Sequence, residues 1–211
     1  MSKPFRIAVF ASGGGSNFQA IADAVKAGRL DARIELLVCD RPQALVVERA
    51  KQADVPVHTF RPKEYPSREA YELEILELLR AKQVALVVLA GYMRILTPVL
   101  VEAYWGRMIN VHPSLLPSFP GLHAVRQALE HGVKVTGITV HLVDGGLDTG
   151  PILAQRALEI RPDDTEASLS ERIHPLEHEL LPQVIQQIAT GHIPIENYRL
   201  TTLKAKDGIE S

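Results

Sequence analysis

Three polar side chains in the second half of the chain carry the groups that acyl transfer needs. Asn110 and His112 stand two residues apart in Asn-Val-His-Pro-Ser-Leu-Leu-Pro, and Asp148 follows in Gly-Gly-Leu-Asp-Thr-Gly. Because side chains alternate along a strand, residues two apart lie on one face. An amide can stabilise a developing oxyanion, an imidazole can move a proton, and a carboxylate can orient the imidazole. The pattern indicates a site for transfer of an acyl-type group.

A glycine-rich loop, Ser-Gly-Gly-Gly-Ser-Asn at residues 12–17, follows the first apolar run and opens a helical segment. Converging backbone N–H groups and a helix N-terminus favour a bound anion. Asp40 suits the ribose-binding acid of a dinucleotide fold, but Phe18 stands where that fingerprint needs its third glycine. A plain turn is the other alternative. We interpret the loop as a cradle for one phosphate, in which Ser16 and Asn17 cap the helix or bind the phosphate.

Further titratable residues have competing interpretations. His174, Glu177 and His178 match the H-x-x-E-H pattern of inverted zinc peptidases, which needs an uninterrupted helix. Pro175 removes an N–H and strains the preceding turn unless the helix kinks or restarts there, and no third ligand is evident. We therefore expect no metal. His141 lies among apolar neighbours, which favours a buried structural imidazole. Arg94 either anchors an anionic ligand or carries a solvated charge at a helix cap.

Composition limits the class of protein. The chain has 211 residues, 46% of them apolar, and a formal charge of -2. The balanced charge gives no electrostatic support for nucleic-acid binding. The longest apolar stretch, 84–93, is too short to span a bilayer, and no signal-peptide core precedes the first strand. The single cysteine, Cys39, excludes an internal disulfide. We expect a cytoplasmic protein that binds neither nucleic acid nor membrane.

Apolar, β-branched runs alternate with helical patterns through the first half, which predicts βαβ units and a parallel sheet. The last two strands follow each other directly, so an antiparallel or edge addition is expected there. The expected strands are 6–11, 34–39, 57–60, 85–90, 108–111, 135–142 and 152–159. The expected helices are 17–27, 44–53, 67–82, 98–104, 123–131 and 165–190. We predict one α/β domain over 1–203, with a mostly parallel, twisted sheet flanked by helices, and a polar tail at 204–211.

Six motifs occur together in a familiar order. They are Gly-Gly-Gly-Ser-Asn, Ser-Arg68-Glu-Ala-Tyr, Gly-Tyr-Met-Arg94-Ile-Leu, Asn110-Val-His112-Pro-Ser-Leu-Leu-Pro, Pro-Gly-Leu-His123 and Leu-Asp148-Thr-Gly-Pro. This set resembles the phosphoribosylglycinamide formyltransferase family of purine biosynthesis over nearly the whole chain. The resemblance implies a Rossmann variant of formyltransferase type, with a nucleotide-phosphate half at about 1–105 and a folate and catalytic half at about 106–203.

The resemblance also implies roles for individual residues. Asn110, His112 and Asp148 match the catalytic positions. The positions that bind the nucleotide substrate are matched by Gly14, Gly15, Ser16, Asn17, Arg68 and Glu177. The positions that line the folate pocket are matched by Met93, Arg94, Ile95, Leu96, Val143, Asp144 and Leu147. The implied substrates are glycinamide ribonucleotide and 10-formyltetrahydrofolate, used without a metal by a monomer or homodimer.

The implied chemistry passes through a tetrahedral intermediate. The amine of the ribonucleotide attacks the formyl carbon, and Asn110 and a protonated His112 donate to the oxyanion that forms. Asp148 favours the charged form of His112 and holds its ring. A water beside Asp148 is expected to carry the proton from the amine to the departing folate nitrogen. A formyl-folate hydrolase or a formyltransferase with another acceptor amine would use the same three residues.

Overall fold

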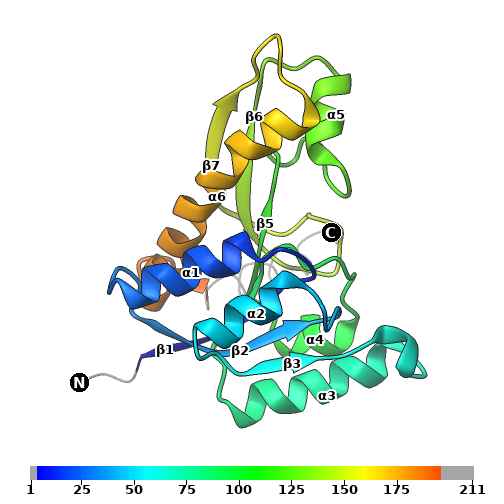
Figure 1. The fold of residues 1–211 in the computed structure, drawn as a ribbon, viewed down its shortest axis with the longest axis vertical. Coiled ribbons are helices and arrows are strands. Elements are labelled where there is room, and N and C mark those ends of the chain that lie inside the picture. Colours follow the sequence, from blue (N-terminus) through cyan, green and yellow to red (C-terminus); the bar gives the residue numbers. More distant parts are fainter. Residues whose placement is uncertain (1–3, 196–211) are drawn as a thin grey trace, which may run out of the picture.

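The computed structural model describes residues 4–195 and contains one continuous sheet flanked by helices (Figure 1). The α/β class and every predicted strand and helix are confirmed, and one short 3-10 helix, η1, is added. The elements are β1 (Phe5–Phe10), α1 (Ser16–Lys26), β2 (Ala32–Cys39), α2 (Leu45–Gln52), β3 (Val57–Thr59), η1 (Pro62–Glu64), α3 (Arg68–Ala81), β4 (Leu86–Leu89), α4 (Pro98–Ala103), β5 (Met108–His112), α5 (Ala124–Glu130), β6 (Val135–Leu142), β7 (Ile152–Glu159) and α6 (Glu166–Ala189). The predicted tail at 204–211 lies outside the described residues.

The sheet has the order β3-β2-β1-β4-β5-β6-β7. Strands β1 to β5 are parallel, whereas β6 pairs antiparallel with β5 and β7 pairs antiparallel with β6. The predicted antiparallel addition is therefore confirmed. Because the chain moves outward in opposite directions from β1 and β4, these two strands flank the topological switch point. Ligands of open α/β sheets bind at the carboxyl ends of such strands.

Two apolar layers cover the two faces of the sheet. In β1, Ile7 and Val9 pack into one layer, and Ala8 and Phe10 into the other. Helices α1, α2 and α6 contribute to the first layer, and α3 and α4 to the second, as Figure 1 shows. A parallel strand that is buried on both faces reads as a continuous apolar run, which is why the strands were visible in the sequence.

Helix α6 is the longest element and carries Glu177. Thr165 and Ser168 form a capping box at its start, and Gly191, with a φ of 75°, follows its end. The helix predicted at 165–190 is confirmed as one element over Glu166–Ala189, and Pro175 lies inside it without interrupting it. Within residues 4–195, no helix combines the length and apolar character that a membrane span requires.

Candidate functional site

The loops after β1 and β4 are joined at the switch point. The backbone N–H of Ser12 donates to the Gly91 carbonyl at 3.0 Å, and the Ser12 hydroxyl accepts from the Met93 N–H at 2.9 Å. Ser12 is buried, so these bonds are protected from solvent. The glycine loop and the segment that begins at Met93 are therefore held side by side.

The glycine loop turns into α1 through Gly15, which has a φ of 73°. A Cβ at Gly15 would lie 2.4 Å from Cγ2 of Val46. Arg49 on α2 donates from Nε to the Gly14 carbonyl at 2.9 Å, and this bond ties the glycine loop to α2. Of the two roles suggested for Ser16 and Asn17, capping the helix or binding the phosphate, the structure does not show the first, since no side chain caps α1. The backbone N–H groups in the first turn of α1 therefore have no side-chain cap and can bind an anionic ligand.

We expect Gly15→Ala to lower the free energy of unfolding by about 2 kcal/mol, because the new methyl group meets Val46 and the backbone is left-handed. Urea denaturation measures this loss. Gly14→Ala is the matched control, since a Cβ there meets nothing within 4 Å. Equal stability of the two variants would contradict the assigned strain at Gly15.

Asn17 and Glu177 join the start of α1 to α6. The Asn17 amide donates from Nδ2 to Glu177 Oε2 at 3.0 Å, and Glu177 is buried. Burial raises the pKa of Glu177, while the Asn17 bond and the charge of His174 act in the opposite direction. Among residues 4–195, no three His, Cys, Asp or Glu side chains form a potential metal cluster. The structure thus places Glu177 beside the glycine loop, where it bonds Asn17.

Arg94 forms an ion pair with Asp40 at the end of β2. Its Nε donates to Asp40 Oδ2 at 2.7 Å, and the Asp40 side chain is fully buried. The Asp40 hydrogen bond raises the pKa of the Arg94 guanidinium. Asp40 is therefore engaged by a cation and does not serve as the ribose acid of a dinucleotide site. Neither role that the sequence suggested for Arg94 included this partner.

We expect Arg94→Met to lower the free energy of unfolding by about 3 kcal/mol, because it leaves the buried Asp40 carboxylate without a cation. The double variant Asp40→Asn/Arg94→Met should recover most of this loss, and urea denaturation of both variants measures it. A single variant within about 0.5 kcal/mol of the unmodified protein would show that the pair contributes nothing.

Arg68 is the first residue of α3, which Ser67 caps by accepting from the Ala70 N–H at 3.2 Å. Burial raises the pKa of Tyr71, with Glu72 adding, and the charges of Arg94 and Arg68 oppose the shift. The charge of Arg68 thus acts on the hydroxyl of Tyr71, one turn further along α3. Its role as a phosphate ligand stays a prediction.

Apolar side chains lie exposed around the segment assigned to folate. Met93 is 59% exposed, Ile95 71% and Leu147 59%. Leu96 and Val143 are half-buried against the apolar layer beneath them. Large apolar groups left on the surface together are typical of a surface that meets a ligand. The folate assignments agree with this exposure and stay predictions.

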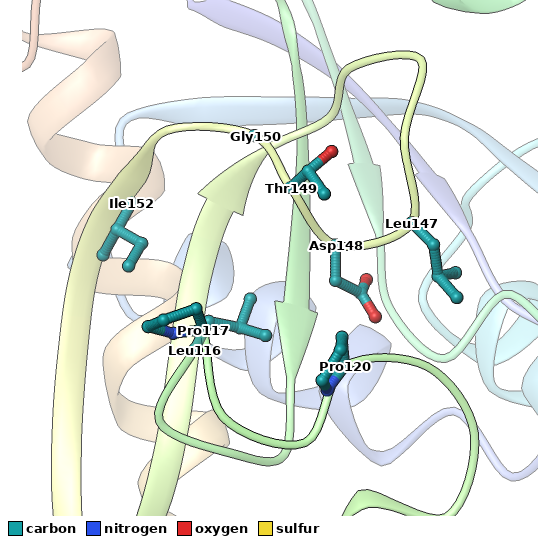
Figure 2. A pocket seen from close by; sticks show the side chains of 8 residues that line it. All are labelled: Leu116, Pro117, Pro120, Leu147, Asp148, Thr149, Gly150 and Ile152. Carbon is teal, nitrogen blue, oxygen red and sulfur yellow. The ribbon is translucent and has the colours of Figure 1, made fainter.

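Asp148 points into a cleft beside this apolar surface (Figure 2). The cleft is lined by Leu116, Pro117, Pro120, Leu147, Asp148, Thr149, Gly150 and Ile152. Asp144 shapes the loop above it, since its Oδ1 accepts from the Gly146 N–H at 3.0 Å and from the Thr149 hydroxyl at 2.7 Å. The carboxylate of Asp148 is thus presented by a loop with its own internal bonds.

Asn110, His112 and Asp148 converge as predicted from their spacing. Both strand residues belong to β5, and His112 Nδ1 lies 3.4 Å from Asp148 Oδ2. The same oxygen accepts from the Gly121 N–H at 2.7 Å. His112 Nε2 lies 2.8 Å from the Phe119 carbonyl oxygen, so both ring nitrogens face acceptors. An imidazolium ring carries an N–H at both nitrogens and can therefore donate to both of these acceptors.

The Asp148 carboxyl is held in its charged form. The pKa of Asp148 falls to about 2. Hydrogen bonding with His141 lowers this pKa most, the Gly121 N–H and the charge of His112 lower it further, and burial acts in the opposite direction. An anion at this position stabilises a cationic His112 and fixes the orientation of its ring. The arrangement is that of a carboxylate and imidazole pair beside an amide.

Comparison with known families matches residues 5–185 to the formyl transferase family. The chain is 54% identical over 183 residues to a phosphoribosylglycinamide formyltransferase of Bacillus subtilis, covering 87% of this chain and 94% of that relative. The chain belongs to the formyl transferase family. The resemblance that the six motifs suggested is confirmed.

Solved structures of formyl transferases agree with this assignment. Glycinamide ribonucleotide transformylase 1 from Geobacillus kaustophilus is 54% identical, with a TM-score of 0.86 over 88% of this chain and 99% of that one. The corresponding transformylase from Symbiobacterium toebii is 46% identical, with a TM-score of 0.88 over 90% of each chain. The predicted fold is therefore that of known transformylases.

Two contacts of this formyl transferase were not predicted from the sequence. His141 was predicted to be structural; it is buried, but its Nε2 lies 3.1 Å from Asn110 Nδ2 and 3.6 Å from Asp148 Oδ1. The Phe119 carbonyl on His112 was not predicted, because a backbone oxygen has no sequence signature. His141 lies directly opposite Asn110 in the pairing of β5 with β6. An antiparallel or edge addition was expected for the last two strands, but the pairing of β6 with β5 and its register were not predicted.

Proposed function

We propose that the chain transfers the formyl group of 10-formyltetrahydrofolate to the primary amine of glycinamide ribonucleotide, giving formylglycinamide ribonucleotide and tetrahydrofolate. The observation that carries this proposal is the convergence of Asn110, His112 and Asp148. The names of the Bacillus and Geobacillus relatives support the choice of acceptor. In this role the enzyme serves purine biosynthesis.

The two substrates are assigned to different sides of the site. The ribonucleotide phosphate binds the first-turn N–H groups behind Gly15, with Glu177 nearby on α6. Arg68 supplies a positive charge. The folate lies on the exposed apolar surface of Met93 to Leu96 and against the loop of Val143 to Leu147. Because these groups come from both halves of the chain, each half serves both substrates.

The reaction follows from the charges that the site holds. The neutral amine attacks the formyl carbon and forms a C–N bond, and the carbonyl electron pair moves to oxygen. Asn110 and the His112 imidazolium donate to that oxyanion. The proton released by the amine passes, through a water beside Asp148, to N10 of the folate as the bond from the formyl carbon to N10 breaks. Tetrahydrofolate leaves with the proton, so no redox partner is needed.

The Phe119 carbonyl has a direct consequence for this step. It accepts the hydrogen bond of His112 Nε2 at 2.8 Å, so the formyl oxygen must take its place before His112 can donate to it. Nδ1 stays on Asp148 throughout. Phe119 has a φ of 56°, an uncommon value for an aromatic residue, and such outliers gather at functional sites. Either the Phe119 carbonyl or the His112 ring must therefore shift when the formyl group binds.

The decisive experiment follows tetrahydrofolate by absorbance, using 10-formyltetrahydrofolate with and without glycinamide ribonucleotide, and each condition is measured with and without a metal chelator. We expect release only when the ribonucleotide is present. Release without it would identify a hydrolase, and release that stops with the chelator would point to a metal enzyme. No release under either condition would overturn the proposal.

The partners proposed for the enzyme are these two small molecules, without nucleic acid or membrane, in the cytoplasm. Whether the enzyme is a monomer or a homodimer stays a prediction, which sedimentation measures directly.

A further inference from the structure

The segment between β4 and α4 forms no helix or strand over residues 92–97, although part of the proposed folate surface lies on it. It carries Met93 and Ile95, which are 59% and 71% exposed. Backbone outside regular secondary structure has few bonds of its own to order it, so its conformation depends on contacts with the rest of the fold. These contacts decide how the segment presents its apolar side chains.

Buried acceptors from three different elements hold this segment. The loop after β1 and the end of β2 hold Met93 and Arg94 through the bonds described above. Thr97, at the far end, is held by Glu72 on α3, which packs beside α4 on the same face of the sheet (Figure 1). The Thr97 N–H donates to both carboxylate oxygens, at 2.9 and 3.1 Å, and the Thr97 hydroxyl donates to Oε2 at 2.6 Å. The segment is thus fixed at both ends.

Glu72 is an unusual residue for its position, because its side chain is 0% exposed. The other buried residues of α3 are Tyr71, Ile75, Leu76 and Leu79, all in the second apolar layer. Burial raises the pKa of Glu72, and the hydrogen bonds from Thr97 oppose this shift. A buried carboxylate costs free energy that an apolar side chain of similar size would avoid. Its bonds to Thr97, and not its packing, therefore explain why a carboxylate lies there.

We propose that Glu72 is a positioning residue for the folate side of formyl transfer, an inference that rests on the proposed function. By holding Thr97 it fixes the end of the segment, so that the exposed apolar side chains before Thr97 are ordered before the folate arrives. A surface that is ordered in advance binds its ligand without the entropy cost of ordering. Glu72 is buried, touches no substrate and acts through Thr97.

The test compares two substitutions of Glu72. Glu72→Leu removes both acceptors, whereas Glu72→Gln keeps an acceptor for the Thr97 N–H and can donate to the Thr97 hydroxyl. We expect Glu72→Leu to raise the dissociation constant of 10-formyltetrahydrofolate about 10-fold, with kcat at saturating folate and KM for glycinamide ribonucleotide within about twofold. Glu72→Gln should recover most of the affinity. A Glu72→Gln variant that folds normally yet binds folate as weakly as Glu72→Leu would overturn the inference.

Leu79→Ala is the matched control for a loss of stability alone. Leu79 lies on the same helix, is 0% exposed and packs into the second apolar layer. Leu79→Ala should lower the melting temperature at least as much as Glu72→Leu does, yet leave the folate dissociation constant within about twofold. All binding is measured well below the melting temperature of each variant. If Glu72→Leu also lowers only the melting temperature, Glu72 is structural and the inference is wrong.

Thr97→Val tests the partner of Glu72. It removes the hydroxyl that donates to Glu72 Oε2 and keeps the backbone N–H. We expect it to raise the folate dissociation constant about threefold in the unmodified enzyme and less than about 1.5-fold in Glu72→Leu. Equal effects in the two backgrounds would show that Glu72 does not act through Thr97.

Titration calorimetry with 10-formyltetrahydrofolate alone separates this inference from the proposed function. If the protein transfers formyl groups but Glu72→Leu binds folate normally, the inference fails and the proposed function stands. If folate binding depends on Glu72 but no formyl group reaches the ribonucleotide, the role of Glu72 in folate binding is supported and the proposed function fails. A protein that binds no folate overturns both.

Discussion

Asp148→Asn is expected to lower kcat by about 10²–10⁴-fold, with little change in folate binding. Asparagine has nearly the same shape and can still accept from the Gly121 N–H, but it removes the charge that faces His112 Nδ1 at 3.4 Å. The imidazolium then loses its counter-ion, and the water that carries the proton loses its carboxylate. Single-turnover rates and equilibrium folate binding measure the two quantities separately.

Asp163→Asn is the control for this substitution, because Asp163 is exposed in the turn before α6. It should leave kcat and the folate dissociation constant unchanged. An Asp148→Asn enzyme that keeps most of its rate would remove Asp148 from the mechanism. If folate binding is lost together with kcat, the substitution has instead changed the conformation of the loop that the bond between Asp144 and Gly146 holds.

The depressed pKa of Asp148 also makes a prediction about stability. With a pKa of about 2 in the folded state and near 3.9 when unfolded, the carboxylate stabilises the fold above the unfolded value. This contribution, about 2 kcal/mol, is lost as the pH falls through the folded pKa. The difference in unfolding free energy between the unmodified enzyme and Asp148→Asn should therefore shrink between pH 5 and pH 2, measured by urea denaturation.

Most strands of this fold were predictable because they are buried and therefore rich in apolar residues, as in β1, β4 and β6. The bounds of β6 and β7 were predicted as the structure shows them, although β7 is mostly exposed. Asn110 and His112 were placed on one face by alternation alone. Strand bounds and side-chain alternation depend only on residues that are close in the sequence, and a periodic pattern reports on such residues.

Contacts between distant parts of the chain were not predictable in the same way. The bonds of Arg94 with Asp40 and of Asn17 with Glu177 join residues 54 and 160 positions apart. Neither pair has a pattern in the sequence, since each depends on strand order and on how α6 crosses α1. His141 was predicted to be buried, which is confirmed, but its contacts were not predicted for a related reason. Its apolar neighbours indicate burial, but its partner across the sheet is set by the register of β5 and β6.

Asn110→Ala is expected to lower kcat by about 10²–10³-fold while KM for both substrates stays nearly unchanged. The amide donates to an oxygen that becomes anionic only in the transition state, so its loss costs about 3 kcal/mol there and little in the bound substrates. Steady-state kinetics with each substrate varied in turn measure the split between kcat and KM. Gln52→Ala, which removes an exposed amide at the end of α2, is the control.

Asn110→Asp distinguishes donation from shape at the same position. The carboxylate fills the space of the amide but has no N–H, and its charge repels the oxyanion. If Asn110 acts by donation, Asn110→Asp must lose at least as much kcat as Asn110→Ala. An Asn110→Asp enzyme that keeps more of its rate than Asn110→Ala would exclude donation to the oxyanion, and so would an alanine effect confined to KM.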